Sequence, residues 1–319
     1  MAIGDIAGLK LGPATRDAFG EALVELGGRK PEIVVVDADL ANSTMASKFQ
    51  TAYPDRFIEV GIAESNMVGV AAGLATCGKE AWATSFSVFL LANAYDQIRV
   101  SVAYPKLNVK LCGSHSGISI GPDGPSQMGI EDIALACALP GFTVIVPCDA
   151  EQTKAAVQAA SALDGPVFIR TGRSKTPVIY ANGNSFTLGK ANTIREGKDI
   201  TLIACGLTVA LALDAAKLLA DQGIEARVLD MATVKPLDEE AVAKAAKETK
   251  GIVVIEEHLL DGGLGSRVAM AAAKTSPAPM AFVAVDNTFA ESGLPEDVLK
   301  KYGFTPENVV TAAKSVLSR

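Results

Sequence analysis

The sequence alternates short β-branched runs with longer helical patterns from one end to the other, and this alternation limits the fold more than any other feature. Residues 33–37 read Ile-Val-Val-Val-Asp, an almost unbroken apolar run of strand length. Such runs are typical of strands that are covered on both faces, as in parallel sheets. Comparable runs occupy residues 57–60, 81–84, 109–112, 143–146, 167–169, 200–204, 226–229, 252–255 and 281–285.

Helical patterns separate these strands. They are predicted at residues 14–27, 41–50, 64–76, 87–103, 131–138, 150–163, 208–222, 238–248, 264–274 and 306–318. Strands that alternate with helices predict parallel sheets joined by right-handed crossovers. Turn-forming residues cluster at 174–198, which predicts a domain boundary there. We therefore expect two three-layer α/β domains, at residues 1–180 and 190–319.

The composition narrows the classes of function. The chain has 319 residues, 49% of them hydrophobic and 20% charged, and a net charge of −7. An acidic balance without basic runs argues against nucleic acid or an anionic membrane as a partner. Neither a signal peptide nor a membrane-spanning run is visible, and the five cysteines form no CxxC pair, so we expect a cytoplasmic protein with reduced thiols. Two histidines leave little for a His-based zinc site or a Ser-His-Asp triad.

The residues that directly follow the predicted strands are the first candidates for a site. In open parallel sheets, ligands bind at the carboxyl ends of the strands, where loops and helix N-termini meet. The segments in question are Asp-Ala-Asp at 37–39, Ser-Phe at 85–86, Gly-Ser-His at 113–115 and Arg-Thr-Gly-Arg at 170–173.

One acid stands beside aromatic residues. Glu64 begins the predicted helix 64–76, and Phe86 and Phe89 follow at helical spacing. Gly69 and Gly73 lie four residues apart on that helix, so another element can approach it closely. An acid near aromatic surface suggests a flat ligand with a polar edge. Taken alone, a carboxylate that is stabilised by the helix dipole and ordinary core aromatics would explain the pattern as well.

Together these stretches resemble the C-terminal half of transketolase, which is the pyrimidine-binding domain of a thiamine diphosphate enzyme followed by the transketolase C-terminal domain. The resemblance covers nearly the whole chain. Its most specific parts are Gly-Ile-Ala-Glu-Ser-Asn-Met at 61–67, the segment 85–99, the segment 114–126 that ends in Gly-Pro-Asp-Gly-Pro-Ser, and Pro-Val-Phe-Ile-Arg-Thr-Gly-Arg at 166–173.

The resemblance implies roles around the cofactor. Glu64 matches the catalytic glutamate that hydrogen-bonds N1′ of the aminopyrimidine of thiamine diphosphate and favours the tautomer that removes the thiazolium C2 proton. Phe86 and Phe89 match aromatic residues that pack on this ring. Asp39 matches an acid near the cofactor of the adjoining active site, although a turn residue after a strand is an equal reading.

The resemblance also implies a sugar phosphate as the substrate. His115 matches a histidine that contacts the sugar phosphate, and Asp123 matches an acid that binds its hydroxyls. The phosphate contacts match Arg16, Ser43 and Arg173. An arginine fork suits a phosphate dianion, whereas either arginine taken singly would be an ordinary surface charge.

Two positions depart from the family's pattern. Gln127 stands where sugar-phosphate transketolases carry a second histidine, and a glutamine cannot shuttle a proton at neutral pH. The identity of the donor and acceptor sugars is therefore open. A third aromatic position falls at Ala92, so that the wall of the ring pocket differs or Tyr95 replaces it.

The family's metal motif, Gly-Asp-Gly with a later asparagine, does not occur in this sequence. The resemblance places it in the N-terminal domain, so we expect no metal ligand here and half of an active site. The implied partner is an N-terminal transketolase subunit that supplies the diphosphate and Mg²⁺ sites in an α2β2 assembly, with two of these chains pairing near Glu64 and residues 95–99. For the glycine-rich segment 261–266 and for His258, we expect structural roles.

Two other readings stay open. The β-subunit of a 2-oxoacid dehydrogenase decarboxylase has the same two-domain layout, but such subunits lack the Gly-Pro-Asp-Gly-Pro segment. His115, Asp123 and Arg173 therefore favour a transketolase. A non-catalytic paralogue is favoured by Gln127 and disfavoured by the glutamate and the two phenylalanines.

Overall fold

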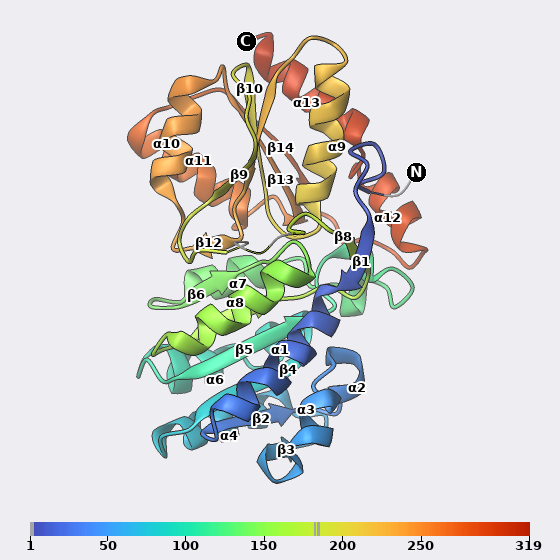
Figure 1. Ribbon diagram of the computed structural model, residues 1–319. Coiled ribbons are helices and arrows are strands. Elements are labelled where there is room, and N and C mark those ends of the chain that lie inside the picture. Colours follow the sequence, from blue (N-terminus) through green and yellow to red (C-terminus); the bar gives the residue numbers. More distant parts are fainter. Residues whose placement is uncertain (1–2, 182, 184–185) are drawn as a thin grey trace.

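The structure of the protein is a computed structural model that describes residues 3–181, 183 and 186–319. Two sheets each lie between layers of helices, which confirms the predicted pair of three-layer α/β domains (Figure 1). The segment 174–198, where we predicted the domain boundary, includes residues 182, 184 and 185, which lie outside the described residues. Across the described ranges, no helix has the length and apolar character that crossing a lipid bilayer requires.

The first domain is built on a seven-stranded sheet in the order β12-β6-β7-β5-β4-β2-β3. Its strands are β2 (Ile33–Asp37), β3 (Phe57–Glu59), β4 (Glu80–Phe86), β5 (Val109–Ser114), β6 (Thr143–Ile145), β7 (Val167–Arg170) and β12 (Thr233–Lys235). Its helices are α1 (Thr15–Arg29), α2 (Ala41–Thr44), α3 (Ser47–Ala52), α4 (Glu64–Thr76), α5 (Ser87–Asn93), α6 (Tyr95–Gln97), α7 (Asp132–Ala138) and α8 (Ala150–Ala162), with short turns η1 (Pro54–Arg56), η2 (Ile98–Ala103), η3 (Ile118–Ile120) and η4 (Pro125–Gln127). The strands are parallel except β12, which runs antiparallel to β6.

The second domain has a five-stranded sheet in the order β14-β13-β10-β11-β9. Its strands are β9 (Asn192–Arg195), β10 (Ile200–Ala204), β11 (Ala226–Asp230), β13 (Ile252–Leu259) and β14 (Met280–Val285), and its helices are α9 (Thr208–Ala220), α10 (Glu239–Glu248), α11 (Leu264–Thr275), α12 (Pro295–Lys301) and α13 (Pro306–Leu317). Only β9 is antiparallel to its neighbour.

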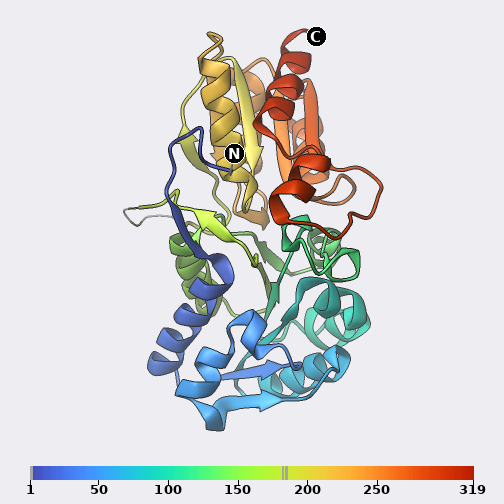
Figure 2. The same cartoon turned by 90° about the vertical axis from the view of Figure 1, so that its right-hand side faces the viewer.

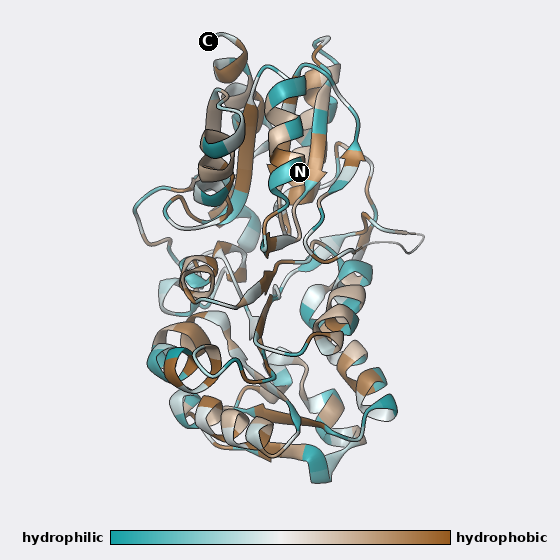
Figure 3. Cartoon of the chain, turned by 90° about the vertical axis from the view of Figure 1, so that its left-hand side faces the viewer, coloured by the Kyte–Doolittle hydropathy of each residue, from teal (hydrophilic) through white to brown (hydrophobic). Residues whose placement is uncertain are grey.

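Alternating side chains along each strand fill both helical layers, as the period of two requires. In β2, Ile33 and Val35 pack with α1, α3 and α8, whereas Val34 and Val36 pack with α4 and α5. Figure 3 shows the strands of both sheets as largely hydrophobic, while the helices carry hydrophilic residues on parts of their surface. The continuous apolar runs in the sequence therefore reflect strands buried from two sides.

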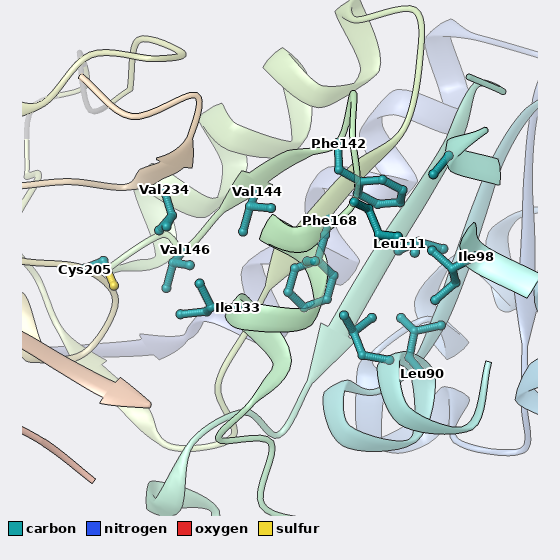
Figure 4. Packing of buried hydrophobic residues seen from close by; sticks show 14 of the residues in the cluster. Leu90, Ile98, Leu111, Ile133, Phe142, Val144, Val146, Phe168, Cys205 and Val234 are labelled. Atoms are coloured by element: carbon teal, nitrogen blue, oxygen red, sulfur yellow. The ribbon is translucent and has the colours of Figure 1, made fainter. Parts of the chain in front are cut away.

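One of the three hydrophobic clusters runs through both domains. The cluster that holds Leu111 and Phe168 of the first sheet continues through Val144 and Val146 to Cys205 and to Val234 of β12 (Figure 4). The N-terminal segment adds a second tie (Figure 2): the backbone N–H groups of Gly4 and Ala7 donate to the Asp214 carboxylate of α9 at 2.6 and 2.8 Å. A short antiparallel pair, β1 (Leu11–Ala14) with β8 (Lys175–Pro177), lies at the same junction.

A buried acid also bridges the domains. Asp230, at the end of β11, is 1% exposed, and its Oδ2 accepts hydrogen bonds from Gln152 Nε2 of α8 at 2.5 Å and from the Tyr180 hydroxyl at 2.7 Å. Its other oxygen has no partner among the described residues. Burial raises the pKa of Asp230 to about 6, against the opposing effect of these donors.

Several predicted boundaries were wrong. The predicted helix 41–50 is two helices, because Met45 adopts a left-handed conformation with φ 66° between α2 and α3. The predicted helix 87–103 breaks after Asn93, and residues 98–103 form a π-helical turn. Asp149 caps α8 as expected of an N-cap acid, because its carboxylate accepts from the backbone N–H of Gln152 at 2.8 Å.

Candidate active site

Parallel strands bring most of the candidate residues to one edge of the first sheet. Glu64 lies just beyond β3, Phe86 ends β4, and His115 and Arg173 follow β5 and β7. Because β4 lies between β2 and β5, and β7 is next to β5, their carboxyl ends share this edge. The site therefore lies where the strand ends of the first domain face the second domain.

Glu64 is the first residue of α4 and is only 4% exposed. Its Oε1 accepts a hydrogen bond from the Ser85 hydroxyl at 3.1 Å, and its Oε2 accepts a long one from Asn93 Nδ2 at 3.5 Å. Both donors are neutral, and the helix N-terminus favours a negative charge. Because a carboxylate oxygen can accept more than one hydrogen bond, Oε2 keeps acceptor capacity for a further, stronger donor.

The turn before Glu64 is closed by a second glutamate. Gly61 has φ 72°, a conformation that favours glycine, and its N–H donates to Glu59 Oε1 at 2.8 Å. The same oxygen accepts from the backbone N–H of Asp39 at 2.9 Å, and Asp39 itself has φ 61°. Glu59 therefore joins the turn after β2 to the turn before α4.

Three rings form a stack next to this acid. The Phe86 ring lies 3.9 Å from the His115 ring at an interplanar angle of 20°, and 5.7 Å from the Phe89 ring at 14°. Phe89 lies one helical turn before Asn93 on α5, and the Asn93 amide donates to Glu64. The acid, the aromatic pair and the histidine predicted from the sequence are thus neighbours.

His115 is held as a neutral ring. Arg16 Nη1 lies 3.3 Å from Nε2, and an arginine can only donate, so Nε2 is the acceptor. Nδ1 then carries the proton and donates to the Ser114 hydroxyl at 2.9 Å. Burial, Arg16 and Arg173 lower the pKa of His115 to about 3. Its φ of 58° is rare for a residue with a side chain and costs on the order of 1–3 kcal/mol, a kind of strain that clusters at functional sites.

Two arginines supply positive charge beside this histidine. Arg16 donates to the carbonyl oxygen of Ser43 at 2.9 Å, while its buried Nε has no partner among the described residues. Arg173 Nη1 donates to the carbonyl oxygen of Ile120 at 3.0 Å and lies 3.3 Å from Asp123 Oδ1. Burial and the charge of Arg173 lower the pKa of Arg16, with the Asp17 charge opposing. The cluster has unused donors suited to an anion.

Other predicted positions lie outside these contacts. Gln127 Oε1 accepts from the Ser126 hydroxyl, and among the described residues neither Gln127 nor Asp39 has a recorded contact with Glu64 or His115. The Tyr95 hydroxyl donates to the carbonyl oxygen of Leu135 at 3.1 Å. The predicted roles of these three residues stay predictions.

A buried ion network below the site was missed from the sequence. Arg170 Nε donates to Asp132 Oδ2 at 2.8 Å, and the same oxygen accepts from the Ser87 hydroxyl at the start of α5. The side chains of Arg170 and Asp132 are 6% and 0% exposed. Breaking such a pair costs about 3–5 kcal/mol. Arg170 at the end of a buried strand and Asp132 at the start of a helix were both visible in the sequence. Their pairing was not, because they are far apart along the chain.

The residues set aside as structural have protein partners. Glu256 accepts from the backbone N–H groups of Leu264 and Gly265 at 2.7 Å each, so its carboxylate occupies the glycine-rich N-terminus of α11. His258 is fully buried, and its Nε2 accepts from the backbone N–H of Ala134 at 3.2 Å. All five cysteines are free. Over the described ranges, no group of three or more His, Cys, Asp or Glu side chains is arranged to hold a metal ion.

Comparison with known proteins defines the class. Residues 12–178 match the transketolase pyrimidine-binding domain, and residues 189–309 match the transketolase C-terminal domain. The chain therefore belongs to the transketolase family and corresponds to its C-terminal section.

Particular relatives make this more specific. A transketolase C-terminal section of Methanocaldococcus jannaschii is 41% identical over 92% of this chain and 93% of its own length. The 6-deoxy-6-sulfo-D-fructose transketolase subunit SqwH of Clostridium sp. (strain MSTE9) is 43% identical over 95% and 94%. Human transketolase is 40% identical, but the chain spans only 49% of its length. A split-gene transketolase, solved as an inactive β4 tetramer, is 47% identical with a TM-score of 0.90 over 96% of this chain and 99% of that chain.

Proposed function

We propose that this chain is the pyrimidine-binding subunit of a split, thiamine diphosphate-dependent transketolase, with its pyrimidine-binding domain at residues 1–180 and its C-terminal domain at 190–319. The observation that carries the proposal is the buried Glu64 carboxylate at the start of α4, beside the ring stack of Phe86, Phe89 and His115. The reaction is the transfer of a two-carbon ketol unit between sugar phosphates in the cytoplasm.

The residues around Glu64 fit an aminopyrimidine. The long contact from Asn93 leaves Oε2 able to accept a hydrogen bond from a ring nitrogen. Phe86 and Phe89 provide flat apolar surface for the ring, and we assign Asp39 to the cofactor of the adjoining site. The bound cofactor would supply the nucleophilic carbon. Glu64 would hold the proton at the ring nitrogen, a role that typically contributes about 10²–10⁴-fold to the rate.

The cation cluster fits the anionic end of a substrate. The guanidinium groups of Arg16 and Arg173 and the chain near Ser43 can bind a phosphate dianion. Asp123 beside Arg173 can accept from sugar hydroxyls, and Gln127 lies four residues further along the same loop, in the turn η4. Neutral His115 can accept a proton near the sugar carbonyl carbon once a bound dianion offsets the two arginine charges.

The site needs a second chain. The chain spans about half the length of human transketolase, and we assign the Mg²⁺ and diphosphate contacts to a separate N-terminal transketolase subunit. Self-association in an α2β2 assembly would use the outer face of α4. Gly69 and Gly73 have open space above them there, and Ile62 is 83% exposed just before the helix. An exposed apolar residue beside a small-residue face suits close packing by another chain.

The experiment mixes this chain with an N-terminal transketolase subunit, thiamine diphosphate and Mg²⁺, and follows ketol transfer from a phosphorylated ketose. Transfer that requires both chains supports the proposal. A sulfonated ketose is assayed in parallel, because the SqwH relative is named for a sulfonated sugar and the arginines could bind either anion. Transfer from the sulfonated sugar only would change the proposed substrate class from phosphorylated to sulfonated sugars. Absence of transfer with both would refute the function.

A further inference from the structure

We propose that Glu257, in the second domain, is a positioning residue for the substrate loop, which we define as residues 115–129. This inference rests on the proposed function and gives the C-terminal domain a part in substrate binding. The loop carries His115, Asp123 and Gln127, and it also supplies the carbonyl oxygen that holds Arg173.

Glu257 binds the substrate loop near its middle. It lies near the end of β13, is 6% exposed, and its Oε1 accepts a hydrogen bond from the backbone N–H of Ser119. Ser119 belongs to the turn η3, and the carbonyl oxygen of the next residue, Ile120, receives the hydrogen bond from Arg173. A buried carboxylate of the second domain therefore sits one residue away from an anchor of the proposed phosphate-binding arginine.

The loop is shaped to receive this carboxylate. Gly117 has φ 76°, and a Cβ atom there would collide with the Glu257 carboxyl group. Gly121 has φ 74°, and a Cβ atom there would lie 2.9 Å from both the Gly293 carbonyl oxygen and the Pro295 ring, at the start of α12. Two glycines thus allow two elements of the second domain to press against the loop.

The backbone of β13 fixes the other end of the loop. Leu259 N–H donates to the carbonyl oxygen of Ile130 at 2.8 Å. Arg170 Nη2 donates to the carbonyl oxygens of Gly129 and Glu257, at 2.9 Å each. Because Arg170 is itself paired with Asp132, this end is rigid. Within residues 117–123, the first domain holds Ile120 through Arg173 and the Ser119 carbonyl oxygen through the Ser174 hydroxyl at 3.1 Å. Glu257 is then the side chain of the second domain that holds the same stretch, at the Ser119 N–H.

The neighbouring residue offers a matched control. Glu256 is also a buried glutamate on β13 that accepts backbone N–H groups, but successive side chains of a strand point to opposite faces, and its partners are Leu264 and Gly265 of α11. Substituting either glutamate removes a buried carboxylate acceptor from β13. Of the two side chains, only that of Glu257 faces the substrate loop.

The test compares Glu257→Ala, Glu257→Asp and Glu257→Gln with Glu256→Ala in the assembled two-chain enzyme. We expect Glu257→Ala and Glu257→Asp to raise KM for the phosphorylated ketose about tenfold, the effect of losing one hydrogen bond to a charged group. We expect kcat and the apparent affinity for thiamine diphosphate to stay within about twofold, as for other uniform-binding losses. Glu257→Gln keeps an acceptor oxygen and should restore most of the loss, whereas Glu256→Ala should leave KM unchanged.

A second measurement needs no activity. Hydrogen exchange of the peptide covering residues 117–124 in this chain should be faster in Glu257→Asp than in the wild type, and unchanged in Glu256→Ala. Unchanged exchange and KM in both Glu257→Asp and Glu257→Ala, or an equal rise of KM in Glu256→Ala, would overturn the positioning role. If the wild-type assembly transfers no ketol unit, the proposed function fails, and the exchange result still decides whether Glu257 positions the loop.

Discussion

Replacing Arg16 tests the proposed anion site most sharply, because its contacts point to a defined loss. Arg16 contacts His115 Nε2 and the Ser43 carbonyl oxygen, and its Nε has no partner among the described residues. A hydrogen bond to a charged group contributes about 1.5–3 kcal/mol. With about 1.4 kcal/mol per factor of ten, Arg16→Ala should lower kcat/KM for a phosphorylated ketose by about 10- to 150-fold.

The assay compares phosphorylated and unphosphorylated ketoses in the two-chain enzyme. Most of the loss should appear only with the phosphorylated substrate, and mainly as a higher KM. Arg29→Ala is the control, because Arg29 ends the same helix at its far end and donates to Gln158 rather than to the site. An equal loss of kcat/KM with both substrates would refute the anion-binding role and point to damage at His115.

Three further outcomes are expected. Glu64→Gln should leave the assembly and its melting temperature nearly unchanged and lower kcat by about 10²–10⁴-fold; unchanged turnover would return Glu64 to helix capping. Arg173→Ala should raise KM for the phosphorylated ketose, and also that for other substrates less strongly, since the arginine braces Ile120 and Asp123; identical increases would count against phosphate contact. Asp230 has its pKa raised to about 6 by burial, so the folded chain holds a proton that the unfolded chain has lost between about pH 4 and 6, and its contribution to stability falls as pH rises through this range. Asp230→Asn should therefore gain stability relative to the wild type as pH rises from about 4 to about 7, by on the order of 3 kcal/mol at most, in urea unfolding of this chain; a constant difference would contradict the shifted pKa.

The strands that are buried on both faces could be predicted, because such burial produces continuous apolar runs in the sequence. The strand at residues 33–37 is covered by helices on both faces, so its sequence is apolar up to its last residue, Asp37. The edge strands β9 and β12 were not predicted, because their sequences, Asn-Thr-Ile-Arg and Thr-Val-Lys, are mostly polar and form no apolar run like those of the equally short strands β6 and β7. The pairing of β12 with β6 is also a long-range event: a segment of the second domain completes the sheet of the first, and local sequence does not encode that.

The sequence predicted which residues belong to the site better than it predicted the contacts between them. Glu64, Phe86, His115 and Arg173 follow strands, and the parallel topology brings such positions together. The proton position on His115 depends on Arg16, which lies 99 residues earlier in the chain. Sequence spacing gives no access to that contact.

The contribution of the second domain was out of reach for the same reason. Glu257 reaches Ser119 across 138 residues. In the sequence it is one of two adjacent acids that directly follow the predicted strand 252–255, and nothing there distinguishes the residue that caps α11 from the one that faces the substrate loop. Adjacent side chains of β13 point to opposite faces of the sheet. Each acid can therefore be assigned its partner only when the elements packed on the two faces are known.

The central claim is that this chain supplies one side of a shared active site, and ketol transfer by the separated and mixed subunits tests it most directly. With thiamine diphosphate and Mg²⁺ present, this chain alone should show no transfer, and activity should appear on titration with the N-terminal subunit and saturate near equimolar chains. Transfer by this chain alone would contradict the account.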